Sequence, residues 1–176
     1  MEEEKKTEVQ EGLFLYEDSK ELSDEARKPK AQIKLFLFSL ADEWYAVDIK
    51  DVLEVSKLPA ITRVPGLPDF ILGVAVMGGN IISITAPNKL FGLDESQGVS
   101  EKQILIIRAA GKTTGFLVDS VGKPLDFPLD AIQQGLSTLP KIKADCIIGE
   151  AKLEDGRVVT ILNLEKIMAS PELQFE

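Results

Sequence analysis

The chain has 176 residues, of which 44% are hydrophobic and 28% charged, and its net charge is −9. This composition suits one globular domain, or two small subdomains that share a core. With 20 basic side chains among 29 acidic ones, a basic face broad enough for nucleic acid is hard to build. The sequence contains no histidine, which excludes Ser-His-Asp and Cys-His nucleophiles and removes the commonest transition-metal ligand.

Cys146 is the one cysteine of the chain, so neither an internal disulfide nor a zinc cluster built on cysteines can form. Its setting in the sequence DCIIGE indicates a buried, inert thiol. No apolar run reaches the roughly 18 residues of a membrane-spanning helix, and MEEEKKTEVQEG lacks the basic start and apolar stretch of a signal peptide. We therefore expect a cytoplasmic protein that does not insert into a membrane.

Residues 1–30 hold ten acidic and six basic side chains and few apolar ones. Such a segment buries too little surface to offset its ordering entropy, which predicts a disordered acidic tail. Its one apolar cluster, LFLY at Leu13 to Tyr16, either docks on a partner or forms a strap against the body. We expect a folded domain over residues 31–170 and a short C-terminal tail over residues 171–176.

Beyond Gln32 the chain changes to short apolar runs rich in β-branched residues, with turn signals about every eight to twelve residues. This spacing predicts an all-β barrel or sandwich with few, short helices. No internal repeat is visible in the sequence. The runs are IKLFLFSL, WYAVDI, AITRV, FILGVAVM, NIISIT, QILIIRA, TTGFLVDSV, CIIGEAKL and RVVTILNL.

Tight connections predict three hairpins. In AKLEDGRVVT the pair Asp155-Gly156 predicts a two-residue turn, whose central residues both need positive φ. VAVMGGNIISI and ILIIRAAGKTTGFLV contain the other two.

Short helices are predicted in three places. DIKDVLEV offers Asp48 as an N-cap for one or two turns, PNKLFG begins with proline and stops at Gly92, and NLEKIMAS is capped by Asn163. The proline-rich PLDFPLDAIQQGLSTLP is expected to run as turns with a one-turn helix.

The stretch AAGKTTG, residues 109–115, contains the Gly-Lys-Thr triplet of a nucleotide-binding loop. Such a loop needs a glycine five residues before the second one and must open a helix, so that backbone N–H groups converge on phosphate. Here the earlier position is Ile106, and β-branched strand residues follow Lys112. We therefore interpret Gly111 as the positive-φ residue of a hairpin turn, with Lys112 solvated beside it.

Carboxylates are the remaining plentiful catalytic groups, and a pair of them can hydrolyse glycosides without histidine. Turns, strand ends and solvated faces explain each candidate equally well, and Trp44 is the sole tryptophan, so the usual sugar-stacking surface is missing. No run resembles an acidic calcium loop, and we expect neither an enzyme nor a bound cofactor or metal. The candidates by residue type are Asp119, Asp126, Glu150, Glu154 and Asp155.

From about Gln32 to about Ala169 the order of elements resembles the CheW-like domain of bacterial chemotaxis. The resemblance implies two SH3-like, five-stranded β-barrels around a shared hydrophobic core, without a catalytic site. It also implies an adaptor in two-component signal transduction, which couples the cytoplasmic tips of methyl-accepting chemoreceptors to the regulatory domain of a CheA-type histidine kinase. The motifs at the family's spacing are Val52-x-Glu54-Val55, Ile61-Thr62-Arg63-Val64-Pro65, Pro68-Asp69-Phe70-Ile71-x-Gly73 and Val118-Asp119-x-Val121.

Carried over by position, the resemblance places a receptor groove between the two barrels. An apolar strip would accept the receptor's helical hairpin, and Glu54 or a neighbour would fix its register by a polar contact. Val52 and Glu54 are expected on a turn near the surface, whereas Val55 is equally well explained as core. The residues expected to bind partners are Val52, Glu54, Val55, Gly73, Met77, Gly78, Gly79 and Ile81.

The central hairpin departs from the family pattern. Where family members usually read Asn-Leu-Arg-Gly, this chain has Val76-Met77-Gly78-Gly79, so glycine replaces an arginine that could bridge carboxylates. The usual proline and aspartate just beyond are Ser83 and Ala86. Two interpretations stay open: the hairpin binds a divergent receptor or kinase, or the module has kept only one interface or works outside receptor arrays.

Overall fold

The structure of the protein is a computed structural model, which describes residues 30–95, 101–134, 139–141 and 143–173. The chain forms two units, Met1–Ala31 and Gln32–Glu176, and the fold below belongs to the second. The acidic tail predicted for residues 1–30, with its LFLY cluster, lies outside the described residues apart from Lys30. Residues 174–176 of the predicted C-terminal tail also lie outside them.

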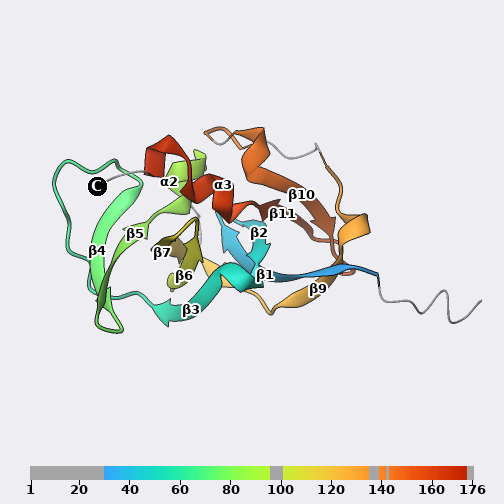
Figure 1. Cartoon of the computed structure of the whole chain (residues 1–176), viewed down its shortest axis with the longest axis horizontal. Helices are drawn as coiled ribbons and strands as arrows, with labels where there is room; N and C mark the ends of the chain where they lie inside the picture. The colour runs from blue at the N-terminus through green and yellow to red at the C-terminus, as the bar shows by residue number, and fades with distance from the viewer. Residues whose placement is uncertain (1–29, 96–100, 135–138, 142, 174–176) are drawn as a thin grey trace, which may run out of the picture. The chain divides into compact units, whose positions relative to one another are not determined.

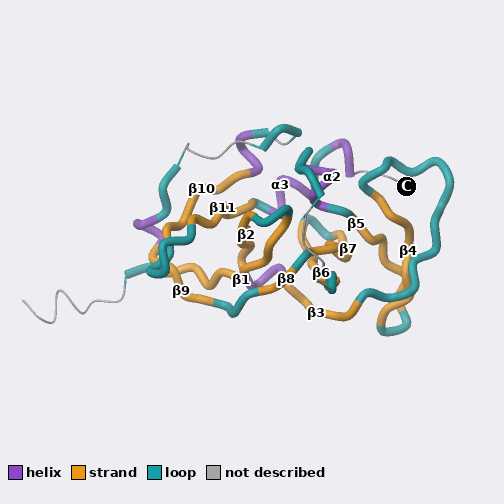
Figure 2. The backbone as a smooth tube through the Cα atoms, turned by 180° about the vertical axis from the view of Figure 1, so that it is seen from behind, coloured by secondary structure: helices purple, strands orange, loops and turns teal. Residues whose placement is uncertain are grey.

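The second unit contains two β-sheets joined by turns and short helices (Figures 1 and 2). Sheet A has the order β10-β11-β2-β1-β8, and β9 also pairs with β1. Its strands are β1 (Gln32–Leu40), β2 (Glu43–Asp48), β8 (Ser120–Val121), β9 (Leu125–Pro128), β10 (Ile147–Lys152) and β11 (Val158–Leu162). Sheet B has the order β3-β6-β7-β5-β4. Its strands are β3 (Val52–Lys57), β4 (Ile71–Met77), β5 (Asn80–Thr85), β6 (Gln103–Ala109) and β7 (Lys112–Val118).

The helices are short, as predicted. α2 (Pro87–Phe91) ends at Gly92, whose φ is 76°, and α3 (Leu164–Met168) is capped by the Asn163 side chain, which accepts a hydrogen bond from the Lys166 N–H. None of the helices that the structure describes is long and apolar enough to cross a membrane. The 3₁₀ helices are η1 (Ile49–Asp51), η2 (Leu129–Ala131), η3 (Ala144–Cys146) and η4 (Pro171–Leu173).

The two sheets share one topology, although the sequence shows no repeat. In sheet B the hairpin β6–β7 pairs through β7 with β5 in parallel, and β5 pairs with β4. In sheet A the hairpin β1–β2 pairs through β2 with β11 in parallel, and β11 pairs with β10. On the other side of the two hairpins, β3 lies beside β6 and β9 lies beside β1. The first hairpin of the unit therefore completes a sheet whose other strands come from the second half of the chain.

The tight turns of the two hairpins also match. The β6–β7 turn has positive φ at Ala110 (50°) and Gly111 (72°), and the β1–β2 turn has it at Ala41 (50°) and Asp42 (67°). Two-residue turns of this kind follow the right-handed twist of antiparallel strands. The Gly-Lys-Thr triplet is thus part of a hairpin turn, as predicted, and the turns provide a common origin for counting matched positions in the two sheets.

One glycine in each sheet lets a neighbouring segment approach closely. A Cβ atom at Gly73 in β4 would lie 2.2 Å from the carbonyl oxygen of Thr62, which bridges to β4. A Cβ atom at Gly149 in β10 would lie 2.5 Å from the carbonyl oxygen of Gln133 in the same way. The hydrogen-bonded strand order of each sheet stays open, so the two subdomains are not the fully closed barrels that were expected.

Alternating side chains divide the core into three clusters. Because successive residues of a strand point to opposite faces, β1 sends Leu35 and Leu37 into sheet A and Phe36 and Phe38 into a core shared by both sheets. In the same way, β6 sends Ile104 and Ile106 into the core of sheet B and Leu105 and Ile107 into the shared core. This arrangement confirms the predicted shared core. The shared cluster includes Phe36, Phe38, Leu40, Tyr45 and Val47 from sheet A, Leu105, Ile107, Ala109, Phe116 and Val118 from sheet B, and Leu90, Phe91, Ile167 and Met168 from the helices.

Three segments differ from the prediction. The helix expected in DIKDVLEV is only η1, in which the Asp48 carboxylate accepts from the Lys50 N–H at 3.0 Å. From Val52 the chain is a strand, because these β-branched residues pair with β6. AITRV is not a strand, since Thr62 alone bridges to β4, and PLDFPLD includes the strand β9.

Two turn residues also behave differently. Asp155 is not among the residues with positive φ, because the loop spans residues 153–157 and the Asp155 carboxylate accepts a hydrogen bond from the Arg157 N–H at 3.0 Å. Lys112 was expected to be solvated, but it is half-buried and its Nζ donates to the carbonyl oxygen of Leu173 at 3.4 Å.

Candidate protein-binding site

The β4–β5 hairpin carries the two most exposed large apolar side chains of the described residues. Val76 is 69% exposed and Ile81 is 73% exposed, and the two are direct cross-strand partners. Between them Gly78 and Gly79 form the turn with φ of 57° and 80°, and no atom lies within 4 Å of a Cβ built at either one. Figure 1 shows the hairpin extending beyond the rest of sheet B. An open apolar pair of this kind marks a surface that a partner covers.

The strand β3 presents polar and apolar groups beside this hairpin. Its register shifts between Val52 and Glu54, which is a β-bulge. The bulge directs Val52 and Val55 toward the shared core, where they are half-buried, and leaves Leu53 (54% exposed) and Glu54 at the surface. Val52 and Glu54 therefore lie on a strand rather than on the predicted turn, and Val52 and Val55 contribute mainly to packing.

A groove of about 590 Å³ separates β3 from the hairpin. Every residue that lines it belongs to sheet B or to its hairpin turn, so this groove lies within one subdomain, whereas the resemblance places a receptor groove between the two. Of the eight residues predicted to bind partners, four line it together: Glu54, Met77, Gly78 and Ile81. The others that line it are Leu53, Asn80, Ile82, Ile106, Arg108 and Thr113.

Arg108 gives the groove a cation opposite in sign to Glu54. Its side chain is exposed and makes no ion pair with any residue in the described part of the chain, so its donors are available for a carboxylate. Arg108 and Leu53 were missed by the sequence analysis. Alternation along QILIIRA could have found Arg108, because Ile104, Ile106 and Arg108 share one face of a strand.

Gly73 does not line the groove. It is buried in β4, and its missing Cβ makes room for the Thr62 carbonyl, so its role in this fold is structural. Gly79 lies in the turn next to Gly78 and likewise shapes the hairpin rather than the groove.

Two of the five carboxylates considered as catalytic candidates, Asp119 and Asp155, stabilise local structure. Asp119 accepts a hydrogen bond from the Ala41 N–H at 2.9 Å. Asp155 accepts from the backbone and side chain of Arg157, which hold the pKa of this carboxyl below its usual value. Within the residues that the structure describes, no cluster of three or more His, Cys, Asp and Glu side chains could hold a metal ion.

Cys146 is buried, as predicted, and burial is the main cause that raises the pKa of its thiol.

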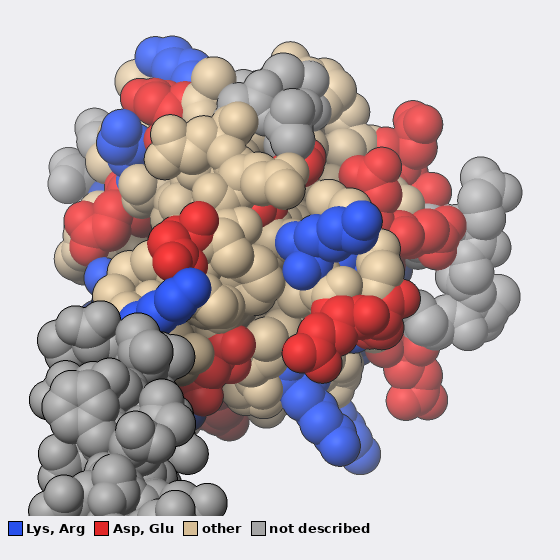
Figure 3. All heavy atoms as spheres, turned by 90° about the vertical axis from the view of Figure 1, so that its right-hand side faces the viewer, with Lys and Arg blue, Asp and Glu red and all other residues tan. Residues whose placement is uncertain are grey.

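Charged side chains are mixed in sign on the face drawn in Figure 3, where Lys and Arg lie among Asp and Glu and do not form a broad basic patch. Among the described residues, the most distinctive surface is therefore the apolar pair Val76 and Ile81.

An exposed apolar hairpin beside a groove with one carboxylate and one guanidinium defines a protein-binding module. The comparisons with known proteins agree with this class. A family model described as the CheW-like domain matches residues 34–172. The chain therefore belongs to the CheW-like domain family, which confirms the resemblance stated from its motifs.

Individual relatives match along most of their length. The chain is 28% identical over 159 residues to a chemotaxis protein CheW of Helicobacter pylori, covering 88% of this chain and 93% of the relative. It is 26% identical over 143 residues to a chemotaxis protein CheW of Klebsiella aerogenes, covering 80% and 84%. A crystal structure of the scaffolding protein TtCheW from Thermoanaerobacter tengcongensis matches with a TM-score of 0.71 at 30% identity, covering 82% of this chain and 98% of that one. This match confirms the predicted all-β fold of two subdomains.

Proposed function

We propose that this chain is a non-catalytic, cytoplasmic scaffold of a bacterial chemosensory array, which couples the tip of a methyl-accepting chemoreceptor to the regulatory domain of a CheA-type histidine kinase. Family membership supports the general role, as do the words chemotaxis and scaffolding in the names of its relatives. The observation that carries the proposal is the β4–β5 hairpin, which offers a groove on one side and an open apolar pair at its tip.

The groove is the proposed site for the receptor's helical tip. Apolar side chains, Met77, Ile82 and Ile106, line it and suit the apolar face of a helix. Glu54 and Arg108 stand among them with opposite charges, so a helix with a matching acid and base would bind in one register only.

Arg108 also accounts for the glycine at position 78. Family members usually have an arginine at the hairpin tip, and here Gly78 lines the same groove as Arg108. We propose that the guanidinium which pairs with the receptor has moved from the hairpin to β6. The groove would then keep its cation while the hairpin tip becomes uncharged.

The kinase domain is proposed to dock on the outer face of the hairpin, over Val76 and Ile81. β4 is an edge strand of sheet B, and its exposed partners are apolar, so a second β-barrel can pack there without burying a charge. The matched cross-strand pair of sheet A is Lys152 and Val158, in which the lysine would oppose such docking.

Isothermal titration calorimetry with the purified receptor tip and kinase domain tests both sites. Val76→Lys should weaken kinase binding by on the order of tenfold or more, which is about 1.4 kcal/mol, and should leave receptor binding unchanged. Val158→Lys serves as the control, because Val158 is an exposed valine in the matched cross-strand pair of sheet A, at the position that corresponds to Ile81. Arg108→Ala should weaken receptor binding, and Arg108→Ala combined with Gly78→Arg should restore it.

Equal loss of kinase binding in Val76→Lys and Val158→Lys would contradict the assignment of the hairpin. Absence of binding to either partner in the unmodified chain would contradict the proposed function itself. A module that works outside receptor arrays is the alternative favoured by Gly78. In a pull-down from native lysate, a module of this kind would bring down a kinase but no receptor.

A further inference from the structure

A cavity of about 360 Å³ lies among the short helices α2, η3 and α3 and the segment that leads into β4. Its volume is near the lower end of the range of about 300 to 1,000 Å³ that is typical of small-molecule sites. It shares no lining residue with the groove of the proposed function. The cavity is therefore a separate feature of the surface.

The interior of this cavity is apolar. Leu90, Cys146 and Ile167 line it as buried members of the shared core, and Phe70 packs against that core. The Ser170 hydroxyl, which also lines the cavity, donates to the carbonyl oxygen of Ile167 at 2.6 Å, so its hydrogen is already used. The interior therefore favours an apolar group over a polar one.

Three lysines line the same cavity, in a chain whose net charge is −9. Lys89 is half-buried, whereas Lys141 and Lys143 are exposed. None of the three forms an ion pair with any residue in the described part of the chain. Among the residues that line the cavity, Asp69 alone is acidic. The positive charges thus outnumber the negative ones here, which attracts an anion.

The helix α2 positions two of these lysines. Lys89 belongs to the helix itself. The Lys141 N–H donates to the carbonyl oxygen of Phe91 at 3.2 Å. A Cβ atom at Gly92 would lie 2.8 Å from the Cγ atom of Lys141, so the glycine makes room for the lysine stem. The local structure therefore holds these cations beside the apolar interior.

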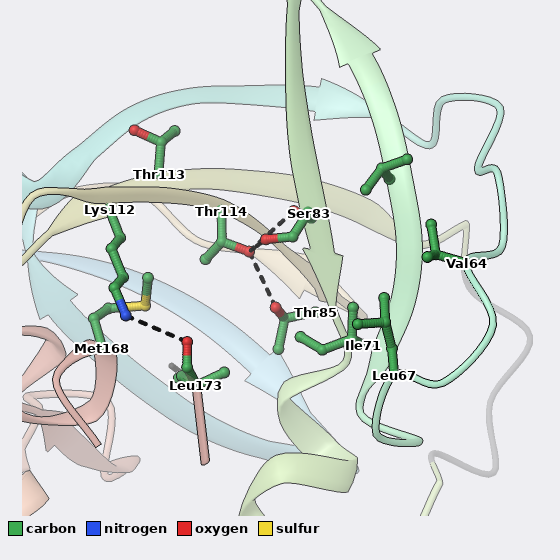
Figure 4. A pocket seen from close by; sticks show the side chains of 11 residues that line it. Val64, Leu67, Ile71, Ser83, Thr85, Lys112, Thr113, Thr114, Met168 and Leu173 are labelled. Carbon is green, nitrogen blue, oxygen red and sulfur yellow. Dashed lines mark hydrogen bonds between the residues drawn. The ribbon is translucent and has the colours of Figure 1, made fainter. Parts of the chain in front are cut away.

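The larger cavity behind the β4–β5 hairpin, of about 1010 Å³, differs in its floor, which is formed by Ser83, Thr85 and Thr114 (Figure 4). Thr114 donates its one hydroxyl hydrogen to the carbonyl oxygen of Ser83 at 2.9 Å. The Ser83 and Thr85 hydroxyls, at 2.8 and 3.0 Å, therefore both donate to the Thr114 oxygen. Counting from the two hairpin turns, Thr114 takes the place of the buried Tyr45 ring of sheet A, so small side chains account for this hollow.

The larger cavity also offers less to an anion. Lys112 is the one cation among its lining residues, and its Nζ donates to the carbonyl oxygen of Leu173 at 3.4 Å. A satisfied hydroxyl floor with one lysine binds an anion less well than three lysines beside an apolar interior. The smaller cavity is therefore the better candidate for a ligand site.

We propose that the cavity among α2, η3 and α3 binds a small organic anion, whose apolar ring or chain contacts the core residues and whose acidic group pairs with the three lysines. An uncharged ligand would leave the lysines unpaired, and a purely polar anion would leave the apolar interior in contact with water. A lysine ammonium is a compact point charge, so a carboxylate, a sulfonate or a phosphate serves equally. Because α2 follows β5 of sheet B and α3 follows β11 of sheet A, the ligand contacts elements of both subdomains.

NMR of the full chain labelled at the isoleucine δ1 methyl groups tests the proposal, with sodium 2-naphthoate as the probe. Ile167 reports on this cavity, Ile71 on the larger cavity and Ile81 on the exposed hairpin pair. The ring current of the probe should shift the Ile167 signal with a Kd on the order of 1 mM or lower. The Ile71 and Ile81 signals should stay unchanged. Substitution of each isoleucine by valine identifies its signal.

The charge of the probe and of the cavity is varied in turn. The neutral 2-naphthamide has the same rings and should bind on the order of tenfold more weakly. Lys89→Gln combined with Lys141→Gln should weaken the binding of 2-naphthoate by about fivefold to tenfold, because each lysine contributes a modest, partly screened attraction. Lys112→Gln is the matched control at the larger cavity and should leave the affinity unchanged.

Equal affinity for 2-naphthoate and 2-naphthamide would overturn the proposal, as would equal affinity of the double variant and the Lys112→Gln variant. It would also be overturned if Ile71 or Ile81 shifted in place of Ile167, or if no site gave a saturable shift. A shift of Ile167 that only an added receptor tip or kinase domain produced would likewise overturn it. The titration needs neither partner, so this proposal and the proposed function fail in different experiments.

Discussion

The β4–β5 and β10–β11 hairpins occupy the same place in two sheets of the same topology, yet their surfaces differ. Their cross-strand pairs match position by position, with Val76 opposite Ile81 in one and Lys152 opposite Val158 in the other. The two pairs thus differ mainly in one residue: sheet A has the charged Lys152 where sheet B has the apolar Val76. Charged side chains on edge strands are a common protection against unwanted pairing.

The turns of these hairpins reinforce the difference. In sheet A two contacts of Arg157 fix the loop. Its guanidinium lies 4.6 Å from the centre of the Trp44 ring in β2, and its Nε lies 2.7 Å from the Asp155 carboxylate. In sheet B two glycines leave the tip bare, and no atom lies within 4 Å of a Cβ built at Gly78. The comparison teaches that topology fixes where a hairpin stands, whereas a few side chains at its tip decide whether it binds.

The largest expected effect tests whether the two sheets are true structural counterparts. Gly73→Ala and Gly149→Ala should each lower the free energy of unfolding by about 3 kcal/mol, because the new Cβ would collide with a backbone carbonyl. Gly78→Ala is the control, since φ there is 57° but the space is open, and it should lose only about 1 kcal/mol. Urea denaturation measures all three. If Gly73→Ala lowered the free energy of unfolding and Gly149→Ala did not, the two sheets would not be structural counterparts at these positions.

The next effect concerns the floor of the cavity behind the hairpin, where the two sheets differ most. Thr114→Val keeps the shape but removes the atom that accepts from both neighbouring hydroxyls, and Thr85 is fully buried. We expect a loss of about 2 kcal/mol in the free energy of unfolding.

Thr113→Val is its matched control, because Thr113 lies on the other face of β7 and should change stability by less than about 0.5 kcal/mol. Equal effects of the two substitutions in urea denaturation would mean that the hydroxyl network does not stabilise the floor.

Local signals in the sequence were enough for much of the fold. Proline at the start and Gly92 at the end predicted α2, and Asn163 predicted the cap of α3, because capping depends on neighbouring residues alone. The alternating apolar runs predicted most strands for the same reason. The repeat was not visible, because it lies in the pairing of distant strands and not in residue identity.

The residues predicted to bind partners are brought together only in part. Spacing within the family gave Glu54, Met77, Gly78 and Ile81, which the structure does bring to one groove. It also gave Gly73, whose role depends on the approach of Thr62, a contact between segments that no local pattern reveals. The bulge between Val52 and Glu54 likewise arises in the pairing of β3 with β6, a strand distant in the sequence, so no local pattern reveals it.

The smallest expected effect concerns the loop of residues 153–157, which joins β10 and β11 in sheet A. Arg157→Ala removes a cation–π contact with the sole tryptophan, Trp44, and should lower the free energy of unfolding by about 0.5 kcal/mol. Trp44 fluorescence should change with it. Arg63→Ala, at an exposed arginine with no such contact, should leave both quantities unchanged.

The same substitution should also change how the loop responds to acid. Hydrogen bonds from Arg157 lower the pKa of Asp155 in the folded chain, so their contribution is present above the ordinary pKa of an aspartate and is lost as pH falls through the lowered value. In Arg157→Ala the side-chain bond is gone but the backbone bond remains, so Asp155 should titrate at a higher pH than in the unmodified chain. NMR titration of the Asp155 carboxyl carbon measures this directly. An unchanged titration would mean that the side chain of Arg157 does not stabilise the Asp155 carboxylate. The difference between the two hairpin surfaces would then rest on Lys152 alone.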